Sequence, residues 1–287
     1  FALVPGVAIE LGYVDPLWGV AYAGLLTAVT FWFSRGIAQR RELKELVRAR
    51  ASARLALPAL GMIALLGAVA LSWRPDGNLH VHVLNVDGMP VLVQTPAGRQ
   101  ILIDGSNSPS ALLAALGARM PFWDRDIDLV VVPRGDARSL NGLLAVIDRY
   151  HVEQIVSVDV PDNRVSREWL DAIAMKSIEV IEAGSSIGIE EGVAVTLDEG
   201  GWAHITVGNT SIGVGTPNPG SRVDVIILNQ ASGEGAEEIQ SIRPQIVVAQ
   251  KSLDAEFALE GIALIVTNTD AVELVFDGVQ WTIQESR

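Results

Sequence analysis

The pattern of hydrophobic and polar positions changes sharply near residue 75. Before this point, residues 16–34 and 55–73 each run for 19 positions without Asp, Glu, Lys or Arg. A helix of that length is about 28 Å long, roughly the hydrocarbon thickness of a bilayer. Tryptophans stand near the ends of these stretches, as interfacial anchors do: Trp18, Trp32 and Trp73. The pattern therefore predicts two transmembrane helices within residues 16–73.

The polar segments around these helices predict their topology. Residues 35–54 contain seven Lys or Arg and only two Glu, so by the positive-inside rule they form a cytoplasmic loop. Residues 1–15 are expected to end an upstream membrane segment. Residues 74–78 are a polar turn cluster and the expected linker. The remainder, residues 79–287, is then an extracytoplasmic domain.

After the linker, short runs of β-forming residues alternate with Gly-rich turns and amphipathic segments. Helices are expected at residues 111–120, in the amphipathic segment at residues 143–147, at 166–175 and at 237–242. Strands are expected at residues 79–86, 91–95, 101–104, 128–132, 154–158, 178–181, 193–197, 204–207, 211–214, 225–228, 245–248, 263–266, 272–276 and 279–283. Two sheet-rich halves that each carry helices predict an α/β fold, specifically an αββα sandwich.

Composition supports a membrane portion. The chain is 49% hydrophobic with a mean hydropathy of +0.33, which is apolar for a soluble enzyme. It begins at Phe1 in the middle of the pattern, so we expect the C-terminal part of a longer protein with further spans upstream. The absence of Cys excludes disulfides and thiolate metal sites.

The charge is concentrated after the linker. Residues 75–287 contain 13 Lys or Arg against 30 Asp or Glu, a net charge of −17. Such a surface repels a phosphate backbone, so strong direct nucleic-acid binding by this part is not expected.

The stretch at residues 128–143 is the most informative. A buried strand ends in a polar loop that contains Arg134, Asp136, Arg138 and Ser139, and an amphipathic helix follows at once. The loop resembles the signature loop of metallo-β-lactamase-like domains, in the version found at the C-terminus of ComEC-type competence proteins. Members with the intact motif hold two divalent metals through His and Asp side chains of this loop.

The resemblance implies that the metal ligands are lost here. Arg134 and Arg138 stand in ligand positions, Ser139 replaces the last His, and only Asp136 keeps an acidic side chain. A guanidinium has no lone pair to offer, and it repels a divalent cation at about 4 Å by roughly 8 kcal/mol at an effective dielectric of about 20. The later ligand positions of the family correspond to Thr216, Asn229 and Gln230. We therefore expect no metal, no cofactor and no catalytic residue.

Asp104 ends the third strand of the domain, where the family's metals would be. With Asp136 it would place two carboxylates in one cleft. We expect an arginine to replace the metal charge there through a structural ion pair, Arg138 first and Arg134 failing it.

The four histidines have structural interpretations. His80 and His82 share one strand face, a spacing that can bind a metal, but the family has ordinary strand residues there. His151 is placed near a helix C-terminus, and His204 in a strand facing solvent.

The resulting prediction is a non-catalytic metallo-β-lactamase-like domain of a multi-pass protein of the bacterial cytoplasmic membrane, with a structural or partner-binding role in DNA uptake. Its partners would be membrane lipid, the upstream part of the same protein and, indirectly, DNA. Two alternatives stay open. One is a metal-dependent phosphodiesterase or nuclease with the altered ligand set Asp104, Asp136, His80 and His82; the other is a membrane-tethered binding module unrelated to DNA uptake.

Overall fold

The computed structural model describes residues 75–120, 124–218, 220–228, 236–250, 262–267 and 271–286. The described residues all belong to one compact unit, residues 75–287. The expected transmembrane helices and the basic loop at 35–54 fall on residues outside the described part. Within the described part, no helix has the length and hydropathy needed to cross a bilayer.

Two mixed sheets form the centre of the domain. The first has the strand order β15-β14-β1-β2-β3-β4-β5-β6. Its members are β1 (Leu79–Val83), β2 (Val91–Gln94), β3 (Gln100–Ile103), β4 (Asp126–Val132), β5 (His151–Ser157), β6 (Glu179–Glu182), β14 (Ala271–Phe276) and β15 (Trp281–Ser286). The strands from β15 to β3 pair antiparallel, and those from β3 to β6 pair parallel.

The second sheet has the order β13-β12-β11-β10-β9-β8-β7. Its members are β7 (Ser186–Glu190), β8 (Val193–Leu197), β9 (Ala203–Val207), β10 (Thr210–Val214), β11 (Val225–Leu228), β12 (Ile246–Gln250) and β13 (Ala263–Thr267). Its strands are antiparallel from β7 to β10 and parallel from β10 to β13.

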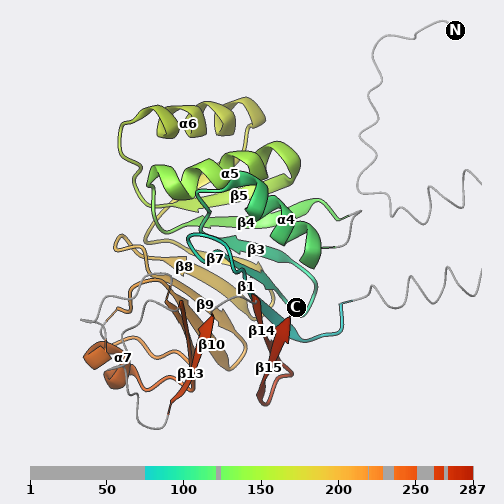
Figure 1. Cartoon of the computed structure of the whole chain (residues 1–287), viewed down its shortest axis with the longest axis vertical. Coiled ribbons are helices and arrows are strands. Elements are labelled where there is room, and N and C mark those ends of the chain that lie inside the picture. The colour runs from blue at the N-terminus through green and yellow to red at the C-terminus, as the bar shows by residue number, and fades with distance from the viewer. Residues whose placement is uncertain are drawn as a thin grey trace, which may run out of the picture. The chain divides into compact units, whose positions relative to one another are not determined.

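Helices cover the outer faces of the two sheets. Figure 1 shows α4 (Pro109–Arg119), α5 (Ala137–Arg149) and α6 (Arg164–Lys176) on the first sheet, and α7 (Ala236–Ile242) beside the second. One buried apolar cluster fills the space between the sheets. Two others join the helices to them. The expected αββα sandwich is confirmed for the described residues.

Local sequence explains where the site-forming helix begins. Asp136 is the N-cap of α5, and its Oδ1 accepts a hydrogen bond from the Ser139 backbone N–H at 2.9 Å. Gly142 lets the first turns of α5 approach the chain after β3, because a Cβ added there would lie 2.5 Å from the Ser106 carbonyl oxygen. The cap fixes the start of α5, and the close approach at Gly142 places this helix against the chain after β3.

Candidate functional site

An ion pair occupies the carboxyl ends of β3 and β4. Arg134, two residues after β4, donates from Nε to Asp104 Oδ2 at 2.9 Å and also from Nη2 to the same oxygen. The Asp104 side chain is fully buried and that of Arg134 is 25% exposed. Arg134 Nη2 also donates to the Gly88 carbonyl at 3.4 Å. The guanidinium therefore joins three loops of the first sheet.

The second oxygen of Asp104 is bound as well. Asp104 Oδ1 accepts a hydrogen bond from the Ser139 hydroxyl at 2.5 Å and from the Gly105 N–H at 2.7 Å. The Gly105 N–H also reaches Ser139 Oγ at 3.1 Å. From the sequence, Ser139 was expected only to replace a metal-binding His of the family. In the structure its hydroxyl donates a hydrogen bond to the buried carboxylate of Asp104.

Asp104 combines a left-handed backbone conformation with a buried carboxyl group. Its φ of 67° lies in the left-handed region, which costs an ordinary residue about 1–2 kcal/mol. Burial raises the pKa of its carboxyl group, while the Arg134 guanidinium, the Ser139 hydroxyl and the Gly105 N–H act in the opposite direction. The ion pair and these donors are thus what keep a buried charge tolerable at this position.

The other two loop residues lie apart from this pair. The Asp136 residue is exposed and caps α5 with its carboxylate, so it does not converge on Asp104. Arg138 is also exposed, and the part of the chain that the structure describes shows no salt bridge to it. Of the two arginines considered from the sequence, the structure brings only Arg134 to Asp104.

These residues do not fit the two metals that the resemblance implies. Both carboxylate oxygens of Asp104 accept hydrogen bonds from other groups, and a permanently charged guanidinium stands beside them. The carboxylate of Asp136 is directed to the start of a helix. The carboxylates of Asp104 and Asp136 are therefore already engaged by groups of the protein itself.

The remaining predicted positions are dispersed. Thr216 is exposed and follows β10 after Gly215. Asn229 and Gln230 lie outside the described residues. His151 is exposed at the first position of β5. His204 is partly buried on β9, and its Nε2 has no hydrogen-bond partner among the described residues.

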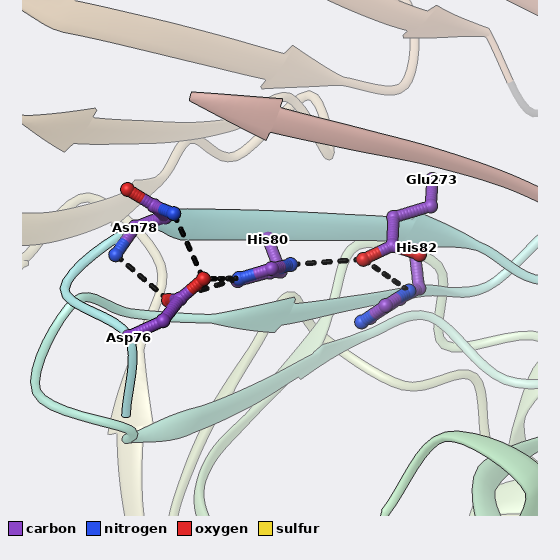
Figure 2. Close-up of polar contacts among 5 residues, drawn as sticks. All are labelled: Asp76, Asn78, His80, His82 and Glu273. Atoms are coloured by element: carbon purple, nitrogen blue, oxygen red, sulfur yellow. Dashed lines mark hydrogen bonds and ion pairs between the residues drawn. The ribbon is translucent and has the colours of Figure 1, made fainter. Parts of the chain in front are cut away.

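A second polar cluster lies on the outer face of the first sheet, on β1 and β14. His80, His82 and Glu273 each offer one ligand atom, and these atoms lie within 4.8 Å of one another. Figure 2 shows His80 between two carboxylates. Its Nδ1 lies 2.8 Å from Glu273 Oε1, and its Nε2 lies 3.0 Å from Asp76 Oδ2.

His82 completes this cluster from a more buried position. The residue is 8% exposed, and its buried Nδ1 has no hydrogen-bond partner in the part of the chain that the structure describes. That nitrogen points toward Glu273 Oε1 at 4.0 Å, too far for a hydrogen bond. The Asp104 and Asp136 carboxylates are not part of this cluster, so the altered ligand set considered from the sequence does not assemble as one group among the described residues.

The two imidazoles differ in protonation. Burial lowers the pKa of His82 to about 4, with Arg119 and His80 acting in the same direction and Glu273 against it. Burial also disfavours the charged form of His80, but its hydrogen bonds with Glu273 and Asp76 outweigh burial and raise its pKa. At neutral pH His82 is thus a neutral ring with a lone pair.

Sequence reasoning missed Glu273 and Asp76. Glu273 lies 193 residues from His80 and reaches it only because β14 pairs with β1, where His82 and Glu273 are direct partners. The available signal was a single acidic residue in the otherwise apolar run at 271–276.

Comparisons with known proteins add a likeness of fold. No protein-family model matches the chain. No curated protein matches it either. Among solved structures it is similar to the metallo-β-lactamase fold protein YhfI from Bacillus subtilis, with 11% identity, a TM-score of 0.46, and coverage of 66% of this chain and 96% of that chain.

Two further structures show a comparable likeness. A diphosphatase from the PhnP family has 12% identity and a TM-score of 0.44, with coverage of 70% of this chain and 98% of that chain. Zn²⁺-bound PqqB from Methylobacterium extorquens has 16% identity and a TM-score of 0.36, with coverage of 56% of each chain. Identities and TM-scores in this range assign neither an activity nor a ligand to this chain.

Proposed function

We propose that residues 79–287 form a non-catalytic metallo-β-lactamase-like domain of a multi-pass bacterial membrane protein that takes part in DNA uptake. In this proposal the domain is extracytoplasmic and acts as a structural or partner-binding element. The observation that carries the non-catalytic part is the Arg134 guanidinium on the buried carboxylate of Asp104.

The chemistry of that contact argues against hydrolysis at the β4–α5 loop. A metal-dependent hydrolase needs ligands with free lone pairs and a bound water that the metal activates. Here Arg134, Ser139 and Gly105 donate to both oxygens of Asp104. A metal could bind Asp104 only if these hydrogen bonds were broken. The same hydrogen bonds connect the loops after β3 and β4. A cation of the protein itself thus takes the electrostatic role of a metal without its Lewis acidity.

The DNA-uptake part rests on the resemblance of residues 128–143 to the signature loop of ComEC-type proteins and on the two apolar stretches before residue 74. The partners proposed on this basis are membrane lipid and the upstream part of the same protein. The charge of −17 on residues 75–287, from 13 basic and 30 acidic residues, opposes strong direct binding of DNA, so any contact with DNA would be indirect.

Two measurements test this proposal. The whole chain, purified in non-ionic detergent and stripped with EDTA, is assayed with Mn²⁺ or Zn²⁺ against bis(p-nitrophenyl) phosphate and single-stranded DNA. We expect no hydrolysis above a metal-only blank. In the bacterium that carries the gene, deletion of the segment for residues 79–287 is expected to reduce transformation to background, while His151→Gln leaves it unchanged.

The alternatives give different results. Metal-dependent hydrolysis that disappears in His82→Gln would support the phosphodiesterase or nuclease alternative, for which the His80, His82 and Glu273 cluster is the specific observation. Normal transformation after deletion of the domain would instead favour a membrane-tethered binding module unrelated to DNA uptake.

A further inference from the structure

We propose that His80, His82 and Glu273 bind one divalent metal ion of the zinc class, with Asp76 as the hydrogen-bond partner that orients His80. This site lies on β1 and β14, and it shares no residue with the loop between β4 and α5. It therefore stands apart from the proposed function.

The spacing of the ligand atoms suits one bridging ion. Zinc binds imidazole nitrogen at about 2.0–2.1 Å and carboxylate oxygen at about 2.0–2.2 Å, so two ligand atoms on one ion lie about 3–4 Å apart. Glu273 Oε1 lies 2.8 Å from His80 Nδ1 and 4.0 Å from His82 Nδ1. The second separation lies at the upper end of that range, and the first would lengthen when an ion replaces the shared proton.

The buried nitrogen of His82 gives a reason for a ligand. Its Nδ1 has no hydrogen-bond partner among the described residues, although the residue is only 8% exposed. A buried polar atom without a partner costs about 1–3 kcal/mol. An ion between His82 and Glu273 gives that nitrogen a partner in the direction in which it already points (Figure 2).

Asp76 supplies the outer contact that metal-binding histidines usually have. Its carboxylate oxygens lie 3.0 and 3.1 Å from His80 Nε2. With Nε2–H donating to Asp76, an ion that binds Nδ1 displaces the proton that this nitrogen shares with Glu273 in the metal-free protein. The carboxylate is held in turn by the backbone N–H and the side-chain amide of Asn78.

The donor set selects the class of ion. Two imidazoles and one carboxylate suit Zn²⁺, Co²⁺, Ni²⁺ or Cu²⁺, whereas Mg²⁺ and Ca²⁺ prefer oxygen ligands. Three protein ligands leave the fourth tetrahedral position to solvent, and the side chains of His80 and Glu273 are 21% and 18% exposed. The ion would cross-link the strand that enters the domain to a strand 193 residues further along the chain.

The test uses the EDTA-stripped whole chain in detergent, titrated with ZnCl₂ by calorimetry and with CoCl₂ by visible spectroscopy. We expect one ion per chain, the intense d–d bands of four-coordinate Co²⁺, and a higher melting temperature with Zn²⁺. Asp76→Asn should weaken binding by about 10- to 100-fold, as loss of an outer contact does. His82→Gln and Glu273→Gln should each weaken it further and remove the Co²⁺ bands.

His151→Gln is the matched control, because it removes an exposed histidine outside the cluster and should leave affinity and spectrum unchanged. Far-ultraviolet circular dichroism and melting of each metal-free variant show whether it is folded. If His82→Gln does not fold, Glu273→Gln decides the question. The proposal fails if the wild-type chain gives no four-coordinate Co²⁺ spectrum, or if folded His82→Gln and Glu273→Gln bind zinc as the wild type does.

Discussion

At the scale of single residues, the Arg134–Asp104 pair carries the largest energetic consequence. Removal of one member of a buried ion pair typically costs about 3–5 kcal/mol, because the other charge stays buried without compensation. Asp104 is fully buried, whereas Arg134 retains some contact with solvent. Substitution of Arg134 leaves the buried carboxylate of Asp104 without its cation, so it should reveal the energy of the pair better than substitution of Asp104.

We expect Arg134→Met to lower the free energy of unfolding by about 3–5 kcal/mol near neutral pH and by less near the unfolded carboxyl pKa of about 4. Burial already raises the pKa of Asp104, and Arg134 opposes this shift. Without Arg134 the pKa of Asp104 in the folded state rises further above its value in the unfolded chain. The Arg134→Met variant should therefore be most stable below the unfolded-state pKa of this carboxyl group and should lose stability as the pH rises through its folded-state pKa. Urea denaturation of the chain between pH 4 and pH 8 measures this.

The matched control for this experiment is Arg138→Met, which removes an exposed arginine of the same loop. It should change stability by less than about 0.5 kcal/mol at every pH. The double variant Arg134→Met with Asp104→Asn should lose the additional pH dependence. An equal cost of Arg134→Met at acid and neutral pH would contradict the assigned role of the ion pair.

How far single residues could be predicted depended on whether their partners are local. The resemblance already placed Asp104 near the metal site of the family and beside the loop that contains Arg134, so their proximity was within reach, although Arg138 was expected first. The hydrogen bond from the Ser139 hydroxyl to Asp104 could not be predicted. The replacement of the family's His by Ser indicates a lost metal ligand, but it does not indicate which group the serine contacts. Glu273 was beyond reach, since its partners depend on the pairing of two strands at opposite ends of the domain.

At the scale of elements, α5 is fixed at its start by a cap and by close packing. Its N-cap residue, Asp136, had been considered as a member of the cleft, but a carboxylate just before a helix is also a common cap. The sequence pattern located the helices and nearly all strands, since their apolar periodicity is regular. It missed β7 (Ser186–Glu190), where Gly188 interrupts the run and the pairing with β8 is irregular.

Asp136→Ala is expected to destabilise the domain by about 0.5–2 kcal/mol, the usual cost of a lost N-cap, whereas Asp136→Asn should retain most of the stability. The reason is the hydrogen bond from the Ser139 N–H to Asp136 Oδ1. Thermal melting of both variants measures the difference. Equal destabilisation by Ala and Asn would point to a role for the negative charge of Asp136 beyond capping.

The close approach of α5 gives a paired test with two helical glycines. Gly142→Ala should cost about 1–3 kcal/mol, because the added Cβ would meet the Ser106 backbone oxygen at 2.5 Å and nitrogen at 2.7 Å. On α4, the added Cβ of Gly117→Ala would meet no atom of the described residues within 4 Å, so this substitution should stabilise the domain by about 0.5–1 kcal/mol. Denaturant midpoints of the two variants should shift in opposite directions; a stabilising Gly142→Ala would mean that the helix does not pack so closely.

At the scale of the whole molecule, the layers followed from the alternation of strands and helices, but the strand order did not. Pairing of β1 with β14 places the entrance of the domain beside its last hairpin. No short turn joins β1 to β14, so local turn residues do not predict their pairing.

The topology expected from residues 1–78 is tested by labelling, since the chain has no cysteine of its own. In intact cells, a membrane-impermeant maleimide should label Asn78→Cys and leave Ser34→Cys unlabelled. The reason is the basic segment at 35–54, which favours the cytoplasmic side. Labelling after permeabilisation is the control for reactivity, and the reverse pattern would overturn the orientation.

The position of β1 also decides how the domain would respond to a mechanical load. Residues 74–78 lead directly into this strand, which is hydrogen-bonded on both sides, to β14 and to β2. Ladder bonds run across the strand direction, so tension transmitted through residues 74–78 loads both ladders at once in shear. A pull from the other terminus would act on β15, an edge strand held on one side, whose bonds can peel one after another. A load on residues 74–78 must therefore disrupt two ladders before β1 leaves the sheet, whereas β15 is held by one ladder.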